Sequence, residues 1–269
     1  MNPKVNFTNY IGEPKYPQLI REVNEENKER KQTYIGDECD KLKGILRLRY
    51  PVQRGVFQKE EDILQVFNHI KAKLEINDDI FRERPVLITE PILNPYQNRT
   101  KIATALFDSL DVSAVFFASQ PILSLYAAGN TTGVILESGD GVTQCCSVFE
   151  GYSIPKSYVR YDYGGRDVTD YLKTLLRREG YAFTTTAEFE IVKKVKELNC
   201  YVTTSVNLDA SKYPEPQSRD YLSSKYSEPQ AHDCYLPDGS TIKLGDEKFL
   251  APEIMFNPGL IGLEYLSVQ

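Results

Sequence analysis

One short turn in the sequence carries residues that could do chemistry. Ser138, Gly139, Asp140 and Gly141 follow a β-branched run at residues 132–136 and precede a mixed run that ends at Phe149. This order predicts a strand, a tight turn and a second strand. Glycines let a backbone approach another group closely, and successive amide N–H groups in such a turn can cradle a phosphate. An ordinary β-hairpin uses the same residue types, so the turn by itself is compatible with either interpretation.

The elements that must position this turn can be predicted from apolar periodicity. Apolar residues at helical spacing predict amphipathic helices over residues 61–74 and 166–178. Thr185 and Glu188 form a capping-box pattern for a further helix that runs to about residue 200. These helices lie on both sides of the turn in the sequence.

Two further helices are expected between residue 90 and the turn. Asn98 is a candidate N-cap for the first of them. Gln120 and Pro121 open the second, because proline suits the first turn of a helix, and Gly129 marks its end. The buried stripe expected for the first helix consists of Ile102, Leu106, Phe107 and Leu110.

Short strands alternate with these helices, which predicts an α/β architecture. Residues 22–32 are nearly all polar and are expected to form a loop or a charged, solvated helix. Residues 207–231 are polar and contain proline, so we expect a surface excursion. The expected extended segments are residues 44–50, 85–89 and 115–118 and a hairpin of residues 234–237 and 240–244.

The composition narrows the class of protein. The 269 residues suit one large or two modest domains, and the net charge of -6 argues against a nucleic-acid-binding surface. The five cysteines lack paired CxxC spacing, so neither a zinc site nor a disulfide framework is predicted. No apolar run reaches membrane-spanning length, and the first residues lack the regions of a secretory signal. We therefore expect an intracellular protein without membrane insertion.

Several longer segments resemble the actin family. They occur in the family's order over nearly the whole chain, and among its branches they are most similar to centractin, the actin-related subunit of the dynactin filament. The segments are TYIGDECDKLKGILRLRYPVQRGV (33–56), RPVLITEPILNPYQNR (84–99), SQPILSLYAAGNTTGVILESGDGVT (119–143), RYDYGGRDVTDYL (160–172), EFEIVKKVKELNCYV (188–202) and YLPDGSTIKLGDEKFLAPEIMF (235–256).

The resemblance implies the α/β fold of actin and Hsp70, a ribonuclease H-like ATPase fold. Its two lobes would hold ATP or ADP with Mg²⁺ in the cleft between them. The polar residues 22–32 lie where actin subunits contact the next subunit of a polymer. The implied parts are a small lobe, 1–127, with a polymer-contact subdomain at about 7–50 and a remainder at 51–127, and a large lobe, 128–269, with 128–163 and 251–269 as its lower part and 164–250 as its upper part.

Matched position by position, the turn together with Val142 resembles the family's second phosphate-binding loop, whose amides meet the β- and γ-phosphates. Gln120 stands where the family orients the attacking water. An amide suits that task because it can accept from water and donate to a phosphate oxygen. On residue types alone, Gln120 is also compatible with a plain helix residue, and the lysines below with a solvated helix face. The positions that match the ribose and adenine pocket are Gly165, Arg166, Asp167, Lys193, Lys196 and Glu197.

Two residues beside the turn depart from the family pattern. Glu137 stands where the family carries an aspartate that helps hold the metal's water shell. Glu137 and Asp140 could still serve Mg²⁺ through water, although the extra methylene changes the reach in a near-octahedral site. Gln144 replaces a histidine that helps place the hydrolytic water, and glutamine cannot titrate near neutral pH. We therefore expect slow or absent hydrolysis, with Gln120 and Gln144 as the residues that would take part in it.

The match begins at residues 7–12, downstream of the family's Gly-rich first phosphate loop and its lysine. It ends at Gln269, before the family's Gly-Gly segment under the adenosine. The resemblance thus implies a fold that is incomplete at both ends, with half of the phosphate clamp missing. Weak nucleotide binding is expected, since amide donors and a lysine charge are lost. Exposed sheet edges would favour association.

These features predict an actin-related cytoskeletal protein of the cytoplasm, a centractin-like filament subunit that binds adenine nucleotide for structure. Its expected partners are actin-like subunits or a dynactin-type assembly, without nucleic acid and without membrane insertion. The alternative is a truncated, nucleotide-independent scaffold or a fragment of the family. A sugar kinase of the same superfamily is disfavoured, because Gln120 stands where those enzymes use a catalytic carboxylate.

Overall fold

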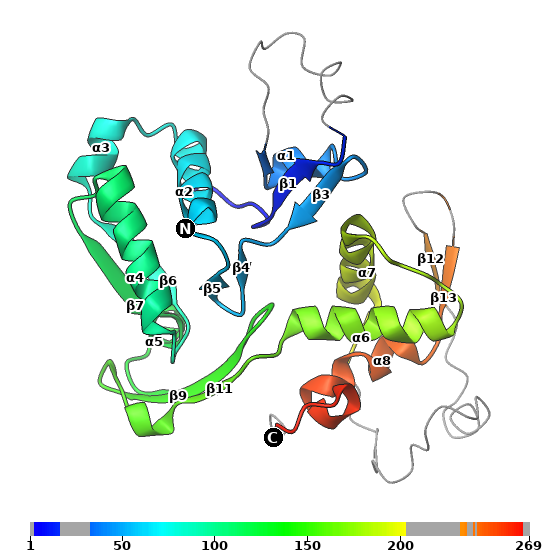
Figure 1. Ribbon diagram of the computed structural model, residues 1–269. Helices are drawn as coiled ribbons and strands as arrows, with labels where there is room; N and C mark the ends of the chain where they lie inside the picture. The colour runs from blue at the N-terminus through cyan, green and yellow to red at the C-terminus, as the bar shows by residue number, and fades with distance from the viewer. Residues whose placement is uncertain (1–2, 17–32, 203–231, 236–238, 240, 266–269) are drawn as a thin grey trace. The chain divides into compact units, whose positions relative to one another are not determined.

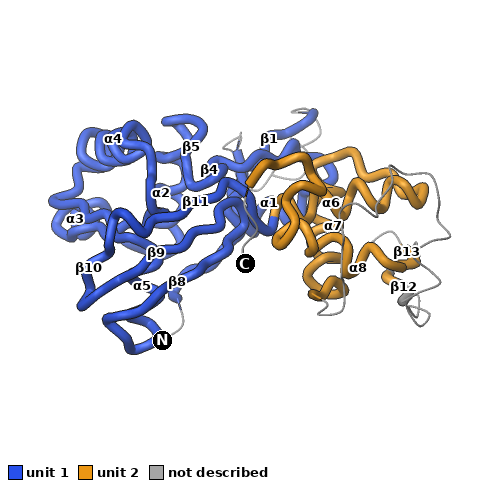
Figure 2. The backbone as a smooth tube through the Cα atoms, turned by 90° about the horizontal axis from the view of Figure 1, so that it is seen from below, with its two compact units in different colours: residues 1–165 blue, residues 166–269 orange. Residues whose placement is uncertain are grey.

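The contacts within the molecule divide the chain into two compact units, residues 1–165 and 166–269, drawn in blue and orange in Figure 2. The expected polymer-contact stretch 22–32 and the expected surface excursion 207–231 lie outside the described residues. The lobe boundary expected at residue 127 remains a prediction. The computed structural model, shown in Figure 1, describes residues 3–16, 33–202, 232–235, 239 and 241–265.

A small antiparallel sheet forms in the N-terminal part of the first unit. Its strands, in spatial order, are β2 (Tyr34–Ile35), β1 (Ile11–Pro14) and β3 (Leu46–Arg49). A Cβ atom on Gly12 would lie 2.7 Å from Leu46 Cδ1 and 2.9 Å from the sulfur of Cys39 in the short helix α1 (Asp37–Asp40). Glycine therefore lets β1 pack closely on the core. The strand predicted at 44–50 is confirmed as β3, whereas β1 is not apparent in a sequence as short as Ile-Gly-Glu-Pro.

Helices build a second core in the first unit. Ile63 packs with Ile102 and Leu106, and all three side chains are buried. The helix predicted from periodicity at residues 61–74 is confirmed as α2. The helical elements are α2 (Glu60–Leu74), α3 (Asp78–Glu83), α4 (Tyr96–Thr104) and the π-helical turn η2 (Ala105–Ser109) that continues α4.

Two predictions for α4 are wrong. Asn98 does not cap the helix, because α4 begins two residues earlier, at Tyr96, and Asn98 lies buried inside its first turn. Phe107 does not belong to the buried stripe, since its side chain is 45% exposed. A π-helical turn takes one more residue than an α-helical turn, so the α-helical spacing of the stripe no longer holds beyond Leu106, which stays buried.

One of two parallel strands leads directly to the short helix that carries Gln120. Strand β6 (Val86–Glu90) pairs with β7 (Val115–Ser119), and β7 continues into α5 (Gln120–Ala127). This arrangement confirms the strands predicted at 85–89 and 115–118 and the helix predicted to begin at Gln120. Gly129 follows α5 with a φ of 75°, in the left-handed region that glycine favours at a helix end.

Strand β9 forms the centre of a further sheet, and β8 pairs along its whole length. One face of this sheet packs on α5, where Leu125 meets Ile135 and Cys146. In the view of Figure 1, α5 lies above β9 and β11. Val134 and Leu136 alternate with Ile135 and are exposed on the other face. The strands are β8 (Gly133–Ser138), β9 (Thr143–Phe149), β10 (Tyr152–Ser153) and β11 (Val159–Tyr161), with the 3₁₀ turn η3 (Pro155–Ser157) before β11.

The second unit surrounds its own apolar core. Leu172 and Leu176 on one helix meet Val192 on the next, together with Ile242 and Ile254. Its elements are α6 (Gly165–Arg178), α7 (Thr186–Asn199), β12 (His232–Tyr235), β13 (Thr241–Leu244), α8 (Glu247–Leu250) and the 3₁₀ turns η5 (Pro252–Met255) and η6 (Pro258–Ile261).

Local sequence signals predicted much of this second unit. The amide of Glu188 donates to the hydroxyl of Thr185 at 3.2 Å, and the carboxylate of Glu188 accepts from the amide of Thr185 at 2.7 Å. This reciprocal pair is the predicted capping box at the start of α7. The hydrogen bonds that its carboxylate accepts from the backbone amides of Thr185 and Thr184 lower the pKa of Glu188. The predicted late hairpin is confirmed as β12 and β13, which pair antiparallel.

Candidate functional site

The predicted strand–turn–strand is a β-hairpin. Strands β8 and β9 are antiparallel, with Glu137 opposite Gln144 and Ser138 opposite Thr143. The turn between them closes with a hydrogen bond of 2.9 Å from the amide of Gly139 to the carbonyl oxygen of Val142. The residues whose types suggested an anion cradle therefore lie together at one tip.

The base of the turn is fixed by the segment that precedes α6. The hydroxyl of Thr143 donates to the carbonyl oxygen of Tyr163 at 2.9 Å. The amide of Gly165 donates to the carbonyl oxygen of Gly139, also at 2.9 Å. A Cβ atom on Gly164 would lie 2.5 Å from the oxygen of Gly139. Only glycine permits this approach, so glycine at position 164 is required for the position of the turn.

The turn of a second, smaller hairpin packs against the other side of the tip. Between β4 (Val52–Gln53) and β5 (Val56–Phe57), Arg54 has a φ of 52° and its guanidinium donates to the carbonyl oxygen of Gly141 at 3.1 Å. Because a trans peptide directs its C=O and N–H in opposite directions, the N–H of Val142 points away from Arg54. Sequence reasoning did not find Arg54, since its contact joins residues 87 positions apart.

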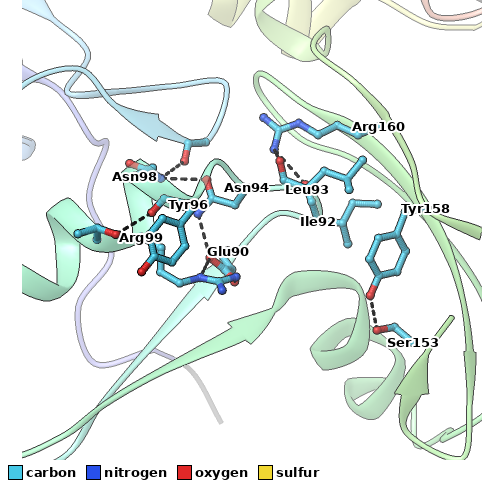
Figure 3. Close-up of polar contacts among 12 residues, drawn as sticks. Glu90, Ile92, Leu93, Asn94, Tyr96, Asn98, Arg99, Ser153, Tyr158 and Arg160 are labelled. Atoms are coloured by element: carbon cyan, nitrogen blue, oxygen red, sulfur yellow. Dashed lines mark hydrogen bonds and ion pairs between the residues drawn. The ribbon is translucent and has the colours of Figure 1, made fainter. Parts of the chain in front are cut away.

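Arg160 on β11 holds Arg54 in place. Its guanidinium donates to the carbonyl oxygen of Arg54 at 2.8 Å, and to those of Ile92 and Leu93 at 3.0 and 3.2 Å. Figure 3 shows Arg160 directed at the latter two carbonyls. Only 9% of the Arg160 side chain is exposed, so its charge interacts with protein groups more than with water. These groups are the three carbonyl oxygens and the carboxylate of Asp162, which lies 3.0 Å from Nε.

Three of the predicted side chains meet beneath the tip. Gln144, 3% exposed, accepts a hydrogen bond of 2.9 Å from the amide of Ile92 through its side-chain oxygen. Its side-chain nitrogen donates to Oε2 of Glu137 at 2.9 Å and to Oε1 of Gln120 at 3.2 Å. The other oxygen of Glu137 accepts from the hydroxyl of Ser124 on α5. Ser124 is a contact that sequence reasoning missed.

The loop that carries Ile92 is held by a polar network at the start of α4 (Figure 3). The carboxylate of Glu90 accepts from Arg99 and from the side-chain nitrogen of Asn94 at 2.9 Å. Asn98 donates to Asn94 at 3.0 Å and to the carbonyl oxygen of Gly55, and accepts from the amide of Phe57. This partly buried network fixes the backbone on which Gln144 depends.

Comparison with known proteins identifies the family. Residues 1–268 match the family model described as Actin. The chain belongs to the actin family. A relative named "Actin-like protein" from Neurospora crassa is 39% identical over 268 residues, which cover 99% of this chain and 67% of the relative.

Membership of the actin family assigns the fold. The mixed sheets and helices are those of the actin-like α/β fold. The actin family is cytoskeletal and generally binds ATP or ADP with Mg²⁺. Within the described ranges, no helix is both long and apolar enough to cross a membrane.

The remaining predicted positions of this actin-family chain lie on α6 and α7. Arg166 and Asp167 are in the first turn of α6, and the Arg166 guanidinium lies 5.7 Å from the centre of the Phe189 ring on α7. Lys193 and Lys196 are half-buried on α7, whereas Glu197 is exposed. The structure thus brings Gln120, Glu137 and Gln144 together, and places the other set in the second unit.

The residues present fit a protein-held metal only in part. Among the residues that the structure describes, no group of three or more His, Cys, Asp or Glu side chains could hold a metal ion. Both oxygens of Glu137 accept hydrogen bonds from protein donors, while Asp140 lies exposed in the turn. The turn itself suits an anion through the Val142 amide that Arg54 orients, while the Gly139 amide donates to Val142 within the turn. A metal would therefore depend mainly on the oxygens of that anion.

Proposed function

We propose that this chain is an actin-related cytoskeletal subunit that binds the phosphates of an adenine nucleotide at the hairpin turn of β8 and β9. The observation that carries the proposal is the peptide between Gly141 and Val142. Arg54 holds its carbonyl oxygen, so the N–H of Val142 is fixed in the opposite direction. A pre-oriented amide in a glycine turn suits a phosphate oxygen.

The proposed phosphate contacts are the backbone amides of the turn. We propose that α6 and α7 supply the contacts to the nucleoside, and the half-buried stems of Lys193 and Lys196 suit a flat base. Mg²⁺ would neutralise phosphate charge when bound, and Asp140 is proposed to reach its water shell. The proposed set is Ser138, Gly139, Asp140, Gly141 and Val142 for phosphate, Gly165, Arg166 and Asp167 for ribose, and Lys193, Lys196 and Glu197 for the base.

We propose that the nucleotide serves structure and polymer state and is turned over slowly or not at all. The side-chain oxygen of Gln120 already accepts from Gln144, which takes one of the two positions that could accept from a water. Gln144 cannot take up a proton near neutral pH. The chain is then at most a weak ATPase, with Gln120 and Gln144 as the residues nearest to such chemistry.

For the cellular role we propose a centractin-like filament subunit of the cytoplasm, with actin-like subunits or a dynactin-type assembly as partners. The 39% identity to the Neurospora crassa "Actin-like protein" supports an actin-like subunit, and the centractin-like part of the proposal rests on the resemblance of the sequence segments. The test is co-sedimentation of the purified chain with actin-type filaments and with a dynactin-like assembly. We expect the chain to pellet with one of them, and its retention in the supernatant with both would remove this role.

A nucleotide-independent scaffold is the second candidate. One observation favours it: the amide of Gly139 donates to Val142 within the turn, so this amide is used inside the protein. Calorimetric titration with Mg-ATP and with adenosine separates the two functions. We expect ATP to bind more tightly than adenosine, and an absence of heat with both ligands would leave the scaffold role.

A further inference from the structure

Glu137 contacts two different elements at once. It lies on β8, and its carboxylate accepts from Ser124 on α5 and from Gln144 on β9. Each of its two oxygens therefore has a protein donor. Ser124 lies four residues after Gln120, so the two side chains project from the same face of α5. Gln144 contacts Gln120 as well, which gives α5 two attachment points one helical turn apart.

The orientation of the Gln144 side chain is settled by its neighbours. The amide of Ile92 can only donate, so the atom of Gln144 that faces it is the oxygen. The NH₂ group then faces Glu137 and Gln120, both through acceptor oxygens. Both hydrogens of this NH₂ group are used, one by Glu137 and one by Gln120. The Gln144 side chain therefore has no further hydrogen to donate to another acceptor.

A magnesium water shell would compete with these contacts. Mg²⁺ requires near-ideal octahedral geometry and keeps several of its waters. To receive a hydrogen bond from such a water, Glu137 would have to redirect lone pairs that face Ser124 and Gln144. Gln144 resists this because it is buried, so its side-chain NH₂ group would be left desolvated and without an acceptor, whereas the exposed Ser124 hydroxyl could turn to water.

We propose that Glu137 is a positioning residue that fastens helix α5, and with it Gln120, to the phosphate hairpin, and that it does not serve the metal. The part of this inference that concerns the metal rests on the proposed nucleotide function. The part that concerns the fastening does not, since it follows from contacts of the protein alone.

Substitutions at position 137 distinguish the two roles. In Glu137→Gln, the new amide can donate to the Ser124 hydroxyl and accept from Gln144, so the contacts are kept and only the charge is lost. Glu137→Ala removes both contacts. Asp140→Asn removes the charge of the carboxylate that is proposed to face the metal's waters, and is the matched comparison.

The metal readout is the ratio of ATP affinities in Mg²⁺ and in EDTA. We expect Glu137→Gln to keep the ratio of the wild type within about twofold, whereas Asp140→Asn lowers it. If Glu137 held the metal's water shell, Glu137→Gln would lower the affinity for Mg-ATP by about 10–100-fold, as is typical of outer-shell metal partners. That result would overturn the proposal.

A second readout needs no nucleotide. Hydrogen exchange of the α5 amides is measured in Ser124→Ala, Glu137→Ala, the double variant and Glu137→Gln. We expect faster exchange in both alanine variants, effects in the double variant that are smaller than their sum, and protection in Glu137→Gln like that of the wild type. Additive effects, or unchanged exchange in Glu137→Ala, would overturn the fastening role. If the wild type binds no ATP, the proposed nucleotide function fails. The hydrogen-exchange measurement still tests whether Glu137 fastens α5 to the hairpin.

Discussion

The guanidinium of Arg54 donates to the carbonyl oxygen of Gly141, 3.1 Å away, although 87 residues separate them in the chain. The backbone of Arg54 lies equally close to the turn: a Cβ atom on Gly141 would be 3.2 Å from the Arg54 nitrogen. One side of the β8–β9 turn is therefore formed by another loop, and this contact sets the direction of the amide that follows Gly141.

Replacement of Arg54 should weaken binding of phosphates without weakening binding of the nucleoside. Arg54→Asn suits the test, because asparagine tolerates the positive φ of this position. We expect ATP affinity to fall by about five- to tenfold, since a charge-assisted hydrogen bond that orients the loop is lost. Adenosine affinity should not change. Titration calorimetry measures both, with Arg47→Asn on the exposed side of β3 as the control. Equal losses for ATP and adenosine would contradict the orienting role.

A side chain at Gly164 should displace the turn. In Gly164→Ala the new Cβ would lie 2.5 Å from the oxygen of Gly139, a distance that forces the backbone to shift. We expect ATP affinity to fall and the unfolding midpoint in urea to drop. Gly44→Ala is the matched control, because no atom lies within 4 Å of the new Cβ there. Similar behaviour of the two variants would show that the turn does not need this close approach.

Loss of the Gln144 amide should destabilise the first unit. Gln144→Leu is close in volume, yet it leaves the Ile92 amide, Glu137 and Gln120 without their partner. The buried Ile92 amide would be left unsatisfied, and such a group costs about 1–3 kcal/mol, so we expect a loss of about 2 kcal/mol. Urea unfolding at equilibrium gives the value. A loss below about 0.5 kcal/mol, the usual size of a surface substitution, would mean that water replaces the amide.

Alkaline pH should destabilise the second unit through Cys200. Burial raises the pKa of its thiol from 9.0 to about 11 in the folded protein. The contribution of this neutral thiol to stability is complete below pH 9, where folded and unfolded thiols are both protonated. It is lost as the pH rises from 9 to about 11, because only the unfolded thiol ionises there.

Unfolding in urea below pH 9 and near pH 11 measures this effect. We expect Cys200→Ala to lose less stability than the wild type over this interval. Burial also raises the pKa of Cys39 to about 11, and Cys39→Ala tests the same loss of stability at alkaline pH in the first unit. Identical pH profiles for Cys200→Ala and the wild type would exclude ionisation of Cys200 as a cause.

Elements with a local cause could be predicted from the sequence. The apolar stripe of α2, the capping box of Thr185 and Glu188, and the glycine turn of β8 and β9 all depend on residues a few positions apart. Asn98 and Phe107 were mispredicted because their surroundings are tertiary. Asn98 is buried by contacts with Gly55 and Phe57, and no periodicity rule anticipates the π-helical turn that exposes Phe107.

The candidate site could be predicted only in part, for the same reason. The resemblance to actin identified Gln120, Glu137 and Gln144, which the structure joins by hydrogen bonds. It could not supply Ser124 or Arg54, because a serine inside a helix and an arginine in a turn are common residues. Their roles come from contacts across the fold, which no spacing in the chain encodes.

Arg160 has a consequence for how the protein is made. It donates to the carbonyl oxygen of Arg54, a residue 106 positions earlier, and to that of Ile92, 68 positions earlier. A ribosome adds about 5–20 residues per second, so the loop of Arg54 leaves the exit tunnel roughly 5–20 s before Arg160 does. Until β11 has emerged, the carbonyl oxygens of Arg54 and Ile92 therefore lack the Arg160 donor, and the loop that holds the β8–β9 turn lacks part of its support.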